Sequence, residues 1–145
     1  MNAPVILRVT HDFAAPAERV FDAWLNPADA KCFLFATPDG EMQQVEIDAR
    51  VGGRGLIVER RPQGVAHHRI QFEQIDRPHR LVFLFSADPA EEGQWTRVTI
   101  DIAPKGEGCT LTLTHEMDPQ WSDYAEQTRH GWTVILASLA RALGE

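Results

Sequence analysis

The hydrophobic pattern in the last third of the chain predicts a strand followed by one long helix. Apolar and polar residues alternate from residue 111 to 116, as in a half-buried strand. After a break at Asp118 and Pro119, apolar residues recur with the spacing of one helix face up to Gly144. These residues are Tyr124, Trp132, Ile135, Leu136, Leu139 and Leu143. A single long helix of this kind needs a curved sheet to pack against, and this arrangement implies a cavity between them.

Two short helices are predicted near the start of the chain. Residues 5–10 predict a first strand with one face, that of Val5, Leu7 and Val9, more apolar than the other. Pro16 opens a short helix, because proline fits the first helical turn. Asn26 and Pro27 suit the N-cap and first position of a second helix, which runs to about Phe33.

The middle of the chain predicts an antiparallel meander, because strand-like runs alternate with turn residues. The run at 81–85 is apolar on both faces, which indicates a central strand or one with its second face at an interface. Segment 86–94 is acidic, and we expect it to be the most mobile loop. Residues 104–108 form a hairpin connection. The other predicted strands are near residues 45–49, 56–60, 68–76 and 97–102.

Length and charge exclude several classes of protein. The 145 residues predict one domain, spanning 1–145. A formal net charge of −7 argues against a nucleic-acid partner, which needs clustered Lys and Arg. Cys32 and Cys109 form no motif and are interpreted as reduced thiols, so we expect a cytoplasmic protein. No apolar run is long enough for membrane insertion.

Five motifs in order resemble one known family. They are Val20-Phe21-Asp22-Ala23-Trp24 with Asn26-Pro27, Val51-Gly52-Gly53-Arg54, the run from Ile75 to Phe83, Leu111-Thr112-Leu113-Thr114-His115-Glu116, and Gly131-Trp132. Together they resemble the group related to the C-terminal domain of the activator of the heat-shock chaperone ATPase. This group belongs to the SRPBCC superfamily, with the birch-pollen-allergen-like and START proteins. The resemblance covers nearly the whole chain.

This resemblance implies an α+β helix-grip fold. A curved antiparallel sheet of about six to seven strands would wrap around the long C-terminal helix, with the two short helices after the first strand. Members of the superfamily bind lipids, hormones or polyketides, and some are cyclases or dehydratases, so function must be argued from the site. Relatives usually carry a tryptophan pair where this chain has Cys32-Phe33, followed by Leu34 and Phe35. We therefore expect a cavity mouth of different shape.

The leading hypothesis is a domain that binds a small hydrophobic or amphipathic molecule, with apolar walls and few polar groups. The polar groups would be His68, His115, Tyr124 and Thr128. Gly131 is interpreted as letting a strand approach the helix closely. The predicted walls are Ile70, Phe72, Phe83, Phe85, Val98, Leu113, Trp132 and Leu136.

His115 is the candidate for chemistry. It shares strand parity with Leu113, so it faces the cavity if Leu113 does. A neutral imidazole there could hydrogen-bond a ligand, act as a general base, or be a core histidine satisfied by a neighbouring side chain or water. In an enzyme of cyclase or dehydratase type, His115 would be the base and Tyr124 or His68 its partner. No other catalytic residue is predicted.

The histidines predict no metal site. His115-Glu116 is similar to the zinc-protease motif, but the second histidine would fall at Pro119. His67 and His68 are adjacent on a strand and point to opposite faces, so they cannot share a metal ion. We also expect no cofactor, because the sequence has no cofactor-binding loop.

A third hypothesis is an interaction protein. The doubly apolar run at 81–85 could pair with a second copy of the chain or with a chaperone. A homodimer, or a chaperone contact in a stress response, would follow from this hypothesis.

Overall fold

The computed structural model describes residues 5–36, 39–88 and 95–145. Within these residues one antiparallel sheet packs against helices, as the predicted α+β helix-grip fold requires. The strands are β1 (Val5–Phe13), β2 (Glu41–Ile47), β3 (Arg54–Arg61), β4 (Gly64–Asp76), β5 (Arg80–Asp88), β6 (Thr96–Lys105) and β7 (Gly108–Met117). The helices are α1 (Ala17–Ala23), α2 (Pro27–Phe33), the 3-10 helix η1 (Pro119–Tyr124) and α3 (Ala125–Ala142).

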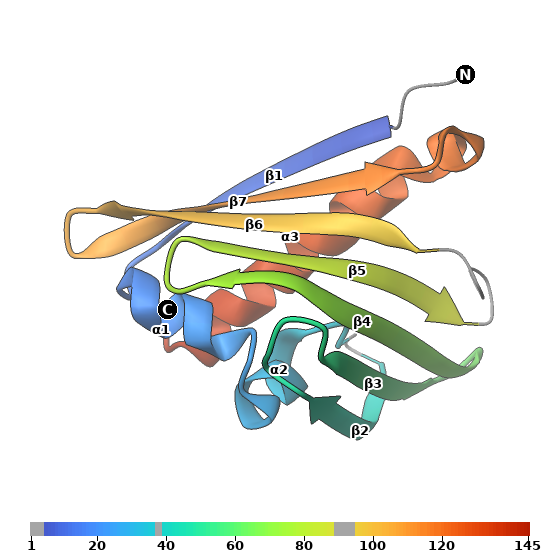
Figure 1. Ribbon diagram of the computed structural model, residues 1–145. Coiled ribbons are helices and arrows are strands. Elements are labelled where there is room, and N and C mark those ends of the chain that lie inside the picture. Colours follow the sequence, from blue (N-terminus) through green and yellow to red (C-terminus); the bar gives the residue numbers. More distant parts are fainter. Residues whose placement is uncertain (1–4, 37–38, 89–94) are drawn as a thin grey trace.

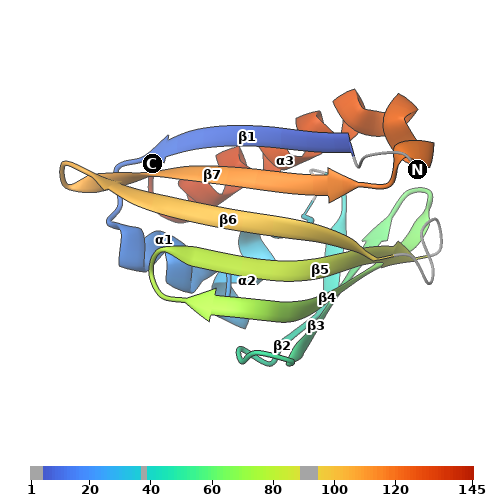
Figure 2. The same cartoon turned by 45° about the horizontal axis from the view of Figure 1, so that its top comes forward.

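The seven strands form one curved sheet in the order β1-β7-β6-β5-β4-β3-β2 (Figure 1). Strands β2 to β7 form a meander, and β1 closes the sheet by pairing with the last strand. In that pair Val5 lies opposite Met117 and Phe13 lies opposite Cys109. Strand β5 is fourth of the seven, so the doubly apolar run is a central strand. Figure 2 shows the curvature of the sheet around α3.

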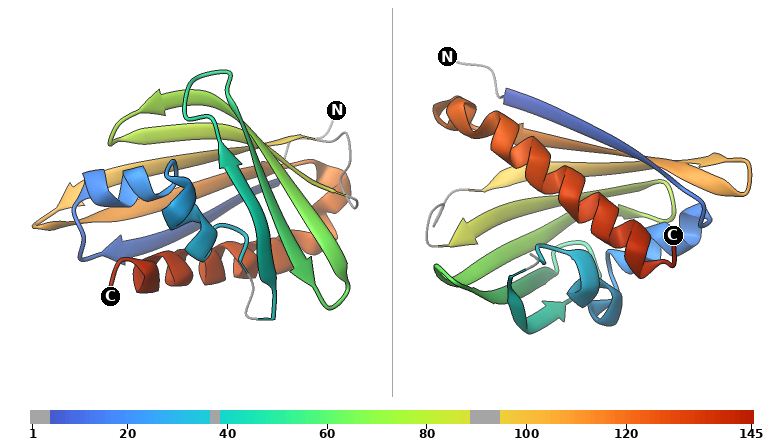
Figure 3. Two further views of the ribbon diagram at one scale, coloured as in Figure 1. Left: turned by 90° about the horizontal axis from the view of Figure 1, so that it is seen from below. Right: turned by 180° about the vertical axis from the view of Figure 1, so that it is seen from behind.

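Helix α3 lies diagonally across the concave face of the sheet, and α1 and α2 lie beside its C-terminal half (Figure 3). Its buried residues are Trp132, Ile135, Leu136 and Leu139, which repeat at three- and four-residue intervals. The helix ends before Gly144, whose φ of +86° suits a left-handed helix terminus. The sequence predicted one continuous amphipathic segment from the Asp118-Pro119 break to Gly144, and the structure differs from this prediction. The segment is divided, because Pro119 begins η1 and α3 starts only at Ala125.

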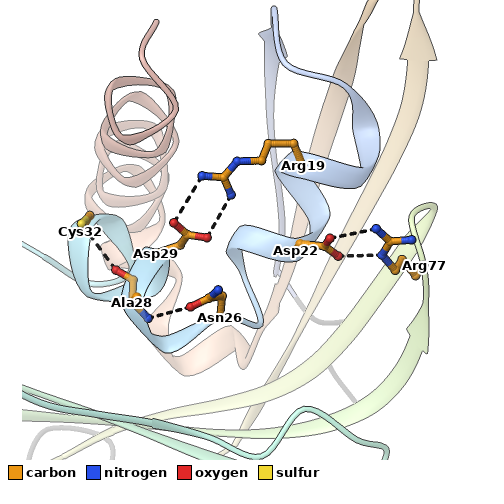
Figure 4. Close-up of polar contacts among 7 residues, drawn as sticks. All are labelled: Arg19, Asp22, Asn26, Ala28, Asp29, Cys32 and Arg77. Atoms are coloured by element: carbon orange, nitrogen blue, oxygen red, sulfur yellow. Dashed lines mark hydrogen bonds and ion pairs between the residues drawn. The ribbon is translucent and has the colours of Figure 1, made fainter.

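Side-chain contacts fix the two short helices (Figure 4). The Ala28 amide donates to Asn26 Oδ1 at 2.9 Å, so Asn26 is the predicted N-cap of α2. Arg19 of α1 and Asp29 of α2 form an ion pair at 3.0 Å. Asp22 of α1 accepts two hydrogen bonds from the Arg77 guanidinium, between β4 and β5, at 2.7 and 2.9 Å.

Aromatic side chains fill the end of the concave face that lies near α1 and α2. Trp24 contacts Phe33 with ring centroids 5.1 Å apart and Phe83 at 6.5 Å. Phe83 in turn contacts Phe72. All four side chains are buried. Any cavity between the sheet and α3 must therefore lie toward the other end of the helix.

Candidate functional site

A cavity of about 490 Å³ lies between the sheet and the N-terminal half of α3. Strands β3, β4, β5 and β7 contribute to it, as does the segment after α2. On the helix, Thr128, Gly131, Trp132 and Ile135 border it at the spacing of one face. The full lining is Phe35, Ala36, Arg61, His68, Phe85, His115, Met117, Thr128, His130, Gly131, Trp132, Val134 and Ile135.

Three rings lie nearly parallel at the cavity. The Phe35 ring stacks on His68 at a centroid distance of 4.3 Å and an angle of 5°, and on Phe85 at 4.9 Å and 17°. Trp132 lies at a steep angle to both phenylalanine rings. Aromatic side chains therefore form much of the cavity lining.

The backbone of Phe35 is left-handed, with a φ of +59°. A bulky residue rarely adopts this conformation, and it costs about 1–3 kcal/mol. Arg61 Nη2 donates a hydrogen bond to the Phe35 carbonyl oxygen at 3.2 Å. This contact across 26 residues helps to hold the Phe35 ring over β4 and β5.

Arg61 is paired with a buried carboxylate. Its Nε donates to Glu59 Oε1 at 2.5 Å, and the Glu59 side chain is only 1% exposed. The Arg61 side chain is 30% exposed and borders the cavity. The pair places one guanidinium, ion-paired with a carboxylate, at the cavity wall.

His115 is hydrogen-bonded at both ring nitrogens. Trp132 Nε1 donates to His115 Nδ1 at 3.0 Å, and because an indole can only donate, the ring proton must lie on Nε2. Nε2 then donates to Thr96 Oγ1 at 2.7 Å, and Thr96 Oγ1 donates to the Phe85 carbonyl oxygen at 3.4 Å. Burial lowers the pKa of His115 to about 4, so the ring is neutral at pH 7. This chain of hydrogen bonds joins α3 to β7, β6 and β5.

His68 differs from His115 although it lies on the same face. Its side chain is only 6% exposed, and Nδ1 has no hydrogen-bond partner among the described residues. The pKa of His68 is lowered to about 4, mainly by burial and to a smaller extent by the nearby Arg61 cation. The Ile57 backbone and Glu59 oppose this shift. A neutral imidazole with one uncommitted nitrogen therefore borders the cavity.

The structure brings five of the predicted site residues together at the cavity: His68, Phe85, His115, Thr128 and Trp132. Six predicted wall residues are buried in the hydrophobic core and do not line the cavity. They are Ile70, Phe72, Phe83, Val98, Leu113 and Leu136. Tyr124 lies in η1 instead of α3 and is 51% exposed, so it does not share the face of Thr128 and Trp132.

The interpretation of Gly131 as a point of close approach is wrong. A Cβ atom built at Gly131 would meet no atom within 4 Å, and the residue borders the cavity. No sequence pattern indicated Arg61 or Ile135 as lining residues, and Phe35 was expected only at the cavity mouth. Arg61 is the last residue of β3 and pairs with Glu59, two residues earlier on the same face of the strand. This spacing of opposite charges could have indicated an ion pair from the sequence. The left-handed turn at Phe35 has no such signal.

Neither a metal-binding cluster nor a membrane-spanning helix is found in the part of the chain that the structure describes. No group of three His, Cys, Asp or Glu side chains there could hold a metal ion. Among the same residues, no helix has the length and apolar character needed to cross a membrane.

These features define a helix-grip domain with a cavity between a curved sheet and its C-terminal helix. Residues 14–144 match the family model described as "Activator of Hsp90 ATPase homolog 1-like protein". The chain belongs to this SRPBCC-type family, as the motifs predicted. Family and fold together suggest a ligand-binding domain. No curated protein matches the chain.

Solved structures show the same fold. A protein from Chromobacterium violaceum is 22% identical, with a TM-score of 0.82 and 94% of each chain covered. Protein Ms6760 from Mycobacterium smegmatis is 18% identical with a TM-score of 0.82, covering 97% of this chain and 91% of the other. An AHSA1-like protein from Aeromonas hydrophila is 22% identical with a TM-score of 0.78, covering 97% and 92%. At these identities the likeness concerns the fold alone.

Proposed function

We propose that the protein binds a small, mostly apolar molecule in the cavity between the sheet and α3. The observation that carries this proposal is the cavity itself. Its volume of about 490 Å³ lies within the range of ~300–1,000 Å³ for small-molecule pockets. Aromatic and aliphatic side chains form most of the wall, and few polar groups border it, as such pockets require.

General-base catalysis is the weaker candidate. His115 has no free ring nitrogen, and the lowered pKa of about 4 makes both His115 and His68 weak bases at pH 7. Tyr124 is exposed outside the cavity and is in no position to assist.

Gly131 provides a direct test of the binding function. A leucine at this position would extend into open space at the cavity, and leucine also favours the helix more than glycine does. We expect Gly131→Leu to fold normally and to lose ligand binding. Gln127→Leu is the matched control, because Gln127 is exposed on α3 and does not border the cavity.

The measurement is ligand-observed NMR with a panel of small molecules that includes aliphatic, aromatic, neutral and anionic members. Binding of at least one class to the native protein and to Gln127→Leu, but not to Gly131→Leu, would support the proposal. If no class binds, or if binding survives in Gly131→Leu, the cavity is not a binding site.

A further inference from the structure

We propose that the cavity selects planar aromatic molecules that carry an oxygen acceptor at one end. The aromatic body would lie against Phe35, Phe85 and Trp132, and the acceptor would face Arg61 and His68. This inference rests on the proposed function, because it specifies the ligand class for the same cavity.

The aromatic half of the proposal follows from the ring geometry. Phe35 lies within 17° of parallel to both His68 and Phe85, so these side chains present flat faces. The Trp132 ring is inclined by 67° to Phe85 and by 57° to Phe35. The faces that these rings turn toward one another are already stacked, so a planar ligand would stack on a face that remains free and meet the edge or face of the indole, which are the favoured arrangements of aromatic pairs. A flexible alkyl chain would be buried without this gain.

The placement of Phe35 supports a specific role for its ring. Its left-handed backbone is unfavourable for a bulky side chain, and such conformations cluster at ligand-contacting sites. Arg61 Nη2 holds the Phe35 carbonyl oxygen. The side chain that fixes the stacking ring is therefore the same one that borders the proposed acceptor position.

The acceptor half follows from two groups with unused hydrogen-bonding capacity. Arg61 Nε and Nη2 bond Glu59 and Phe35, whereas Nη1 has no acceptor among the described residues. Guanidinium nitrogens only donate, so a ligand group at this position must accept. His68 Nδ1 is also without a partner although the side chain is 94% buried, which is rare in folded proteins. Because Nδ1 is fully buried, a rotation of the His68 ring is needed to bring it, as the Nδ1–H tautomer, to donate to the same oxygen.

Charge does not restrict the acceptor to one chemical form. Arg61 is ion-paired with Glu59, so a neutral carbonyl oxygen can accept from it without leaving an unpaired guanidinium charge. A carboxylate would gain more from a charged donor, because charge-assisted hydrogen bonds are stronger. The shared chemistry is an oxygen acceptor attached to a flat ring, and the probes below separate the two forms.

The test compares dissociation constants for matched probes, measured by NMR titration at pH 7. The pair 2-acetylnaphthalene and 2-ethylnaphthalene differs only in the acceptor oxygen. The pair 2-naphthoate and decanoate differs in the ring. We expect the acetyl compound to bind about tenfold more tightly than the ethyl compound, and naphthoate about tenfold more tightly than decanoate. The ratio of naphthoate to acetylnaphthalene affinity then shows which acceptor form is preferred.

The variant His68→Phe keeps a stacking ring and removes Nδ1. It should bring the two neutral naphthalenes to within about threefold of each other while leaving the ethyl compound unchanged, and Gln127→Leu should keep the native ratio. If His68→Phe does not fold, the double variant Glu59→Gln/Arg61→Met is the second choice, because it removes every guanidinium donor without leaving Glu59 as a buried unpaired charge. A merely structural role for His68 would change both affinities equally.

The outcomes distinguish this inference from the proposed function. If decanoate binds as tightly as naphthoate, if the acetyl group adds nothing, or if the variant keeps the native ratio, the ligand class is wrong. In each of these cases the proposed function stands as long as Gly131→Leu still removes binding. If no naphthalene binds but another class in the NMR panel does, only this inference fails. If nothing in either set binds, both proposals fail.

Discussion

His115 and His68 lie on the same concave face of the sheet but differ in hydrogen bonding. His115 lies beside an indole that donates to Nδ1 and a hydroxyl that accepts from Nε2, so all of its polar atoms are satisfied. His68 stacks on Phe35, and a phenyl ring offers no hydrogen bond to Nδ1. The first histidine therefore stabilises the contact between α3 and the sheet, whereas the second holds a buried polar atom without a hydrogen-bond partner among the described residues.

The hydrogen bond from Trp132 can be tested by removing its donor. In Trp132→Phe the ring is retained, but Nδ1 of His115 becomes a buried acceptor without a partner. We expect the free energy of unfolding to fall by about 1–3 kcal/mol, beyond a smaller loss from the reduced ring size. Urea denaturation at pH 7 measures this. Trp95→Phe is the control, because Trp95 is 41% exposed and its replacement should change stability by less than about 0.5 kcal/mol. Equal effects in both variants would contradict the assignment.

For single residues, the sequence predicted which way a side chain points better than it predicted its hydrogen-bond partner. Strand parity placed His68 and His115 on the inner face. The Trp132 partner of His115 depends on how far α3 is shifted along the sheet, and no local pattern encodes that shift. The same limit explains why Phe35 was noticed only as a departure from relatives.

Helix α3 contains a position where its sequence is not optimal for helix formation. Gly131 lies in the helix interior, and the space next to it is empty. Glycine there is less favourable than alanine by about 1 kcal/mol, and no close contact requires it. The requirement for open volume at the cavity is a sufficient physical reason for a glycine at this position.

Two glycine substitutions should therefore change stability in opposite directions. Gly131→Ala should raise the free energy of unfolding by about 1 kcal/mol, because its Cβ meets no atom within 4 Å. Gly55→Ala in β3 should lower it by about 1–3 kcal/mol, because its Cβ would lie 2.6 Å from Ile70 Cγ1. Thermal denaturation of both variants beside the native protein measures the two shifts. A destabilised Gly131→Ala would show that a close contact exists after all.

Among the elements, those with local signals were predicted most accurately. Helix α2 begins at Pro27 and ends at Phe33, as expected from the Asn26 cap and the apolar spacing. The division between η1 and α3 was missed, because the apolar stripe continues through Tyr124 in sequence although the backbone geometry changes. The segment expected to be the most mobile loop, 86–94, lies partly outside the described residues, and its first three residues belong to β5.

At the scale of the whole molecule, the concave groove is divided into a filled half and an open half. Aromatic side chains from α1 and α2 close one end, and the cavity occupies the other. The fold could be predicted because β2 to β7 pair in chain order and because the motifs resemble a family whose fold is known. The boundary between packed core and cavity could not, because it depends on the sizes of side chains from four separate elements that meet only in three dimensions.

Burial of the two inward histidines makes the stability of the whole domain depend on pH. The unfolded chain binds protons at these side chains near pH 6.5, whereas the folded state binds them only near pH 4. Between these values the unfolded state holds more protons, so stability must decrease as the pH falls. We expect a loss of roughly 2 kcal/mol for each histidine between pH 7 and 5.

Urea denaturation at pH 7, 6 and 5 tests this expectation. His68→Phe should show about half of the native decrease, because only His115 then remains. The carboxyl pKa values of Asp12 and Asp22 are lowered below 3.8 by their hydrogen-bonding partners Thr110 and Arg77, so these groups act below this pH window. A variant with the full native decrease would mean that other groups cause it.

The pairing of β1 with β7 delays the completion of the sheet during synthesis. Partners in this pair are separated by at least 96 residues along the chain, from Phe13 to Cys109, and β1 is hydrogen-bonded to no other strand among the described residues. During synthesis at ~5–20 residues per second, β1 would wait roughly 5–20 seconds before its partner leaves the ribosome. Throughout that interval its Val5, Leu7 and Val9 side chains would be available to chaperones or to other nascent chains.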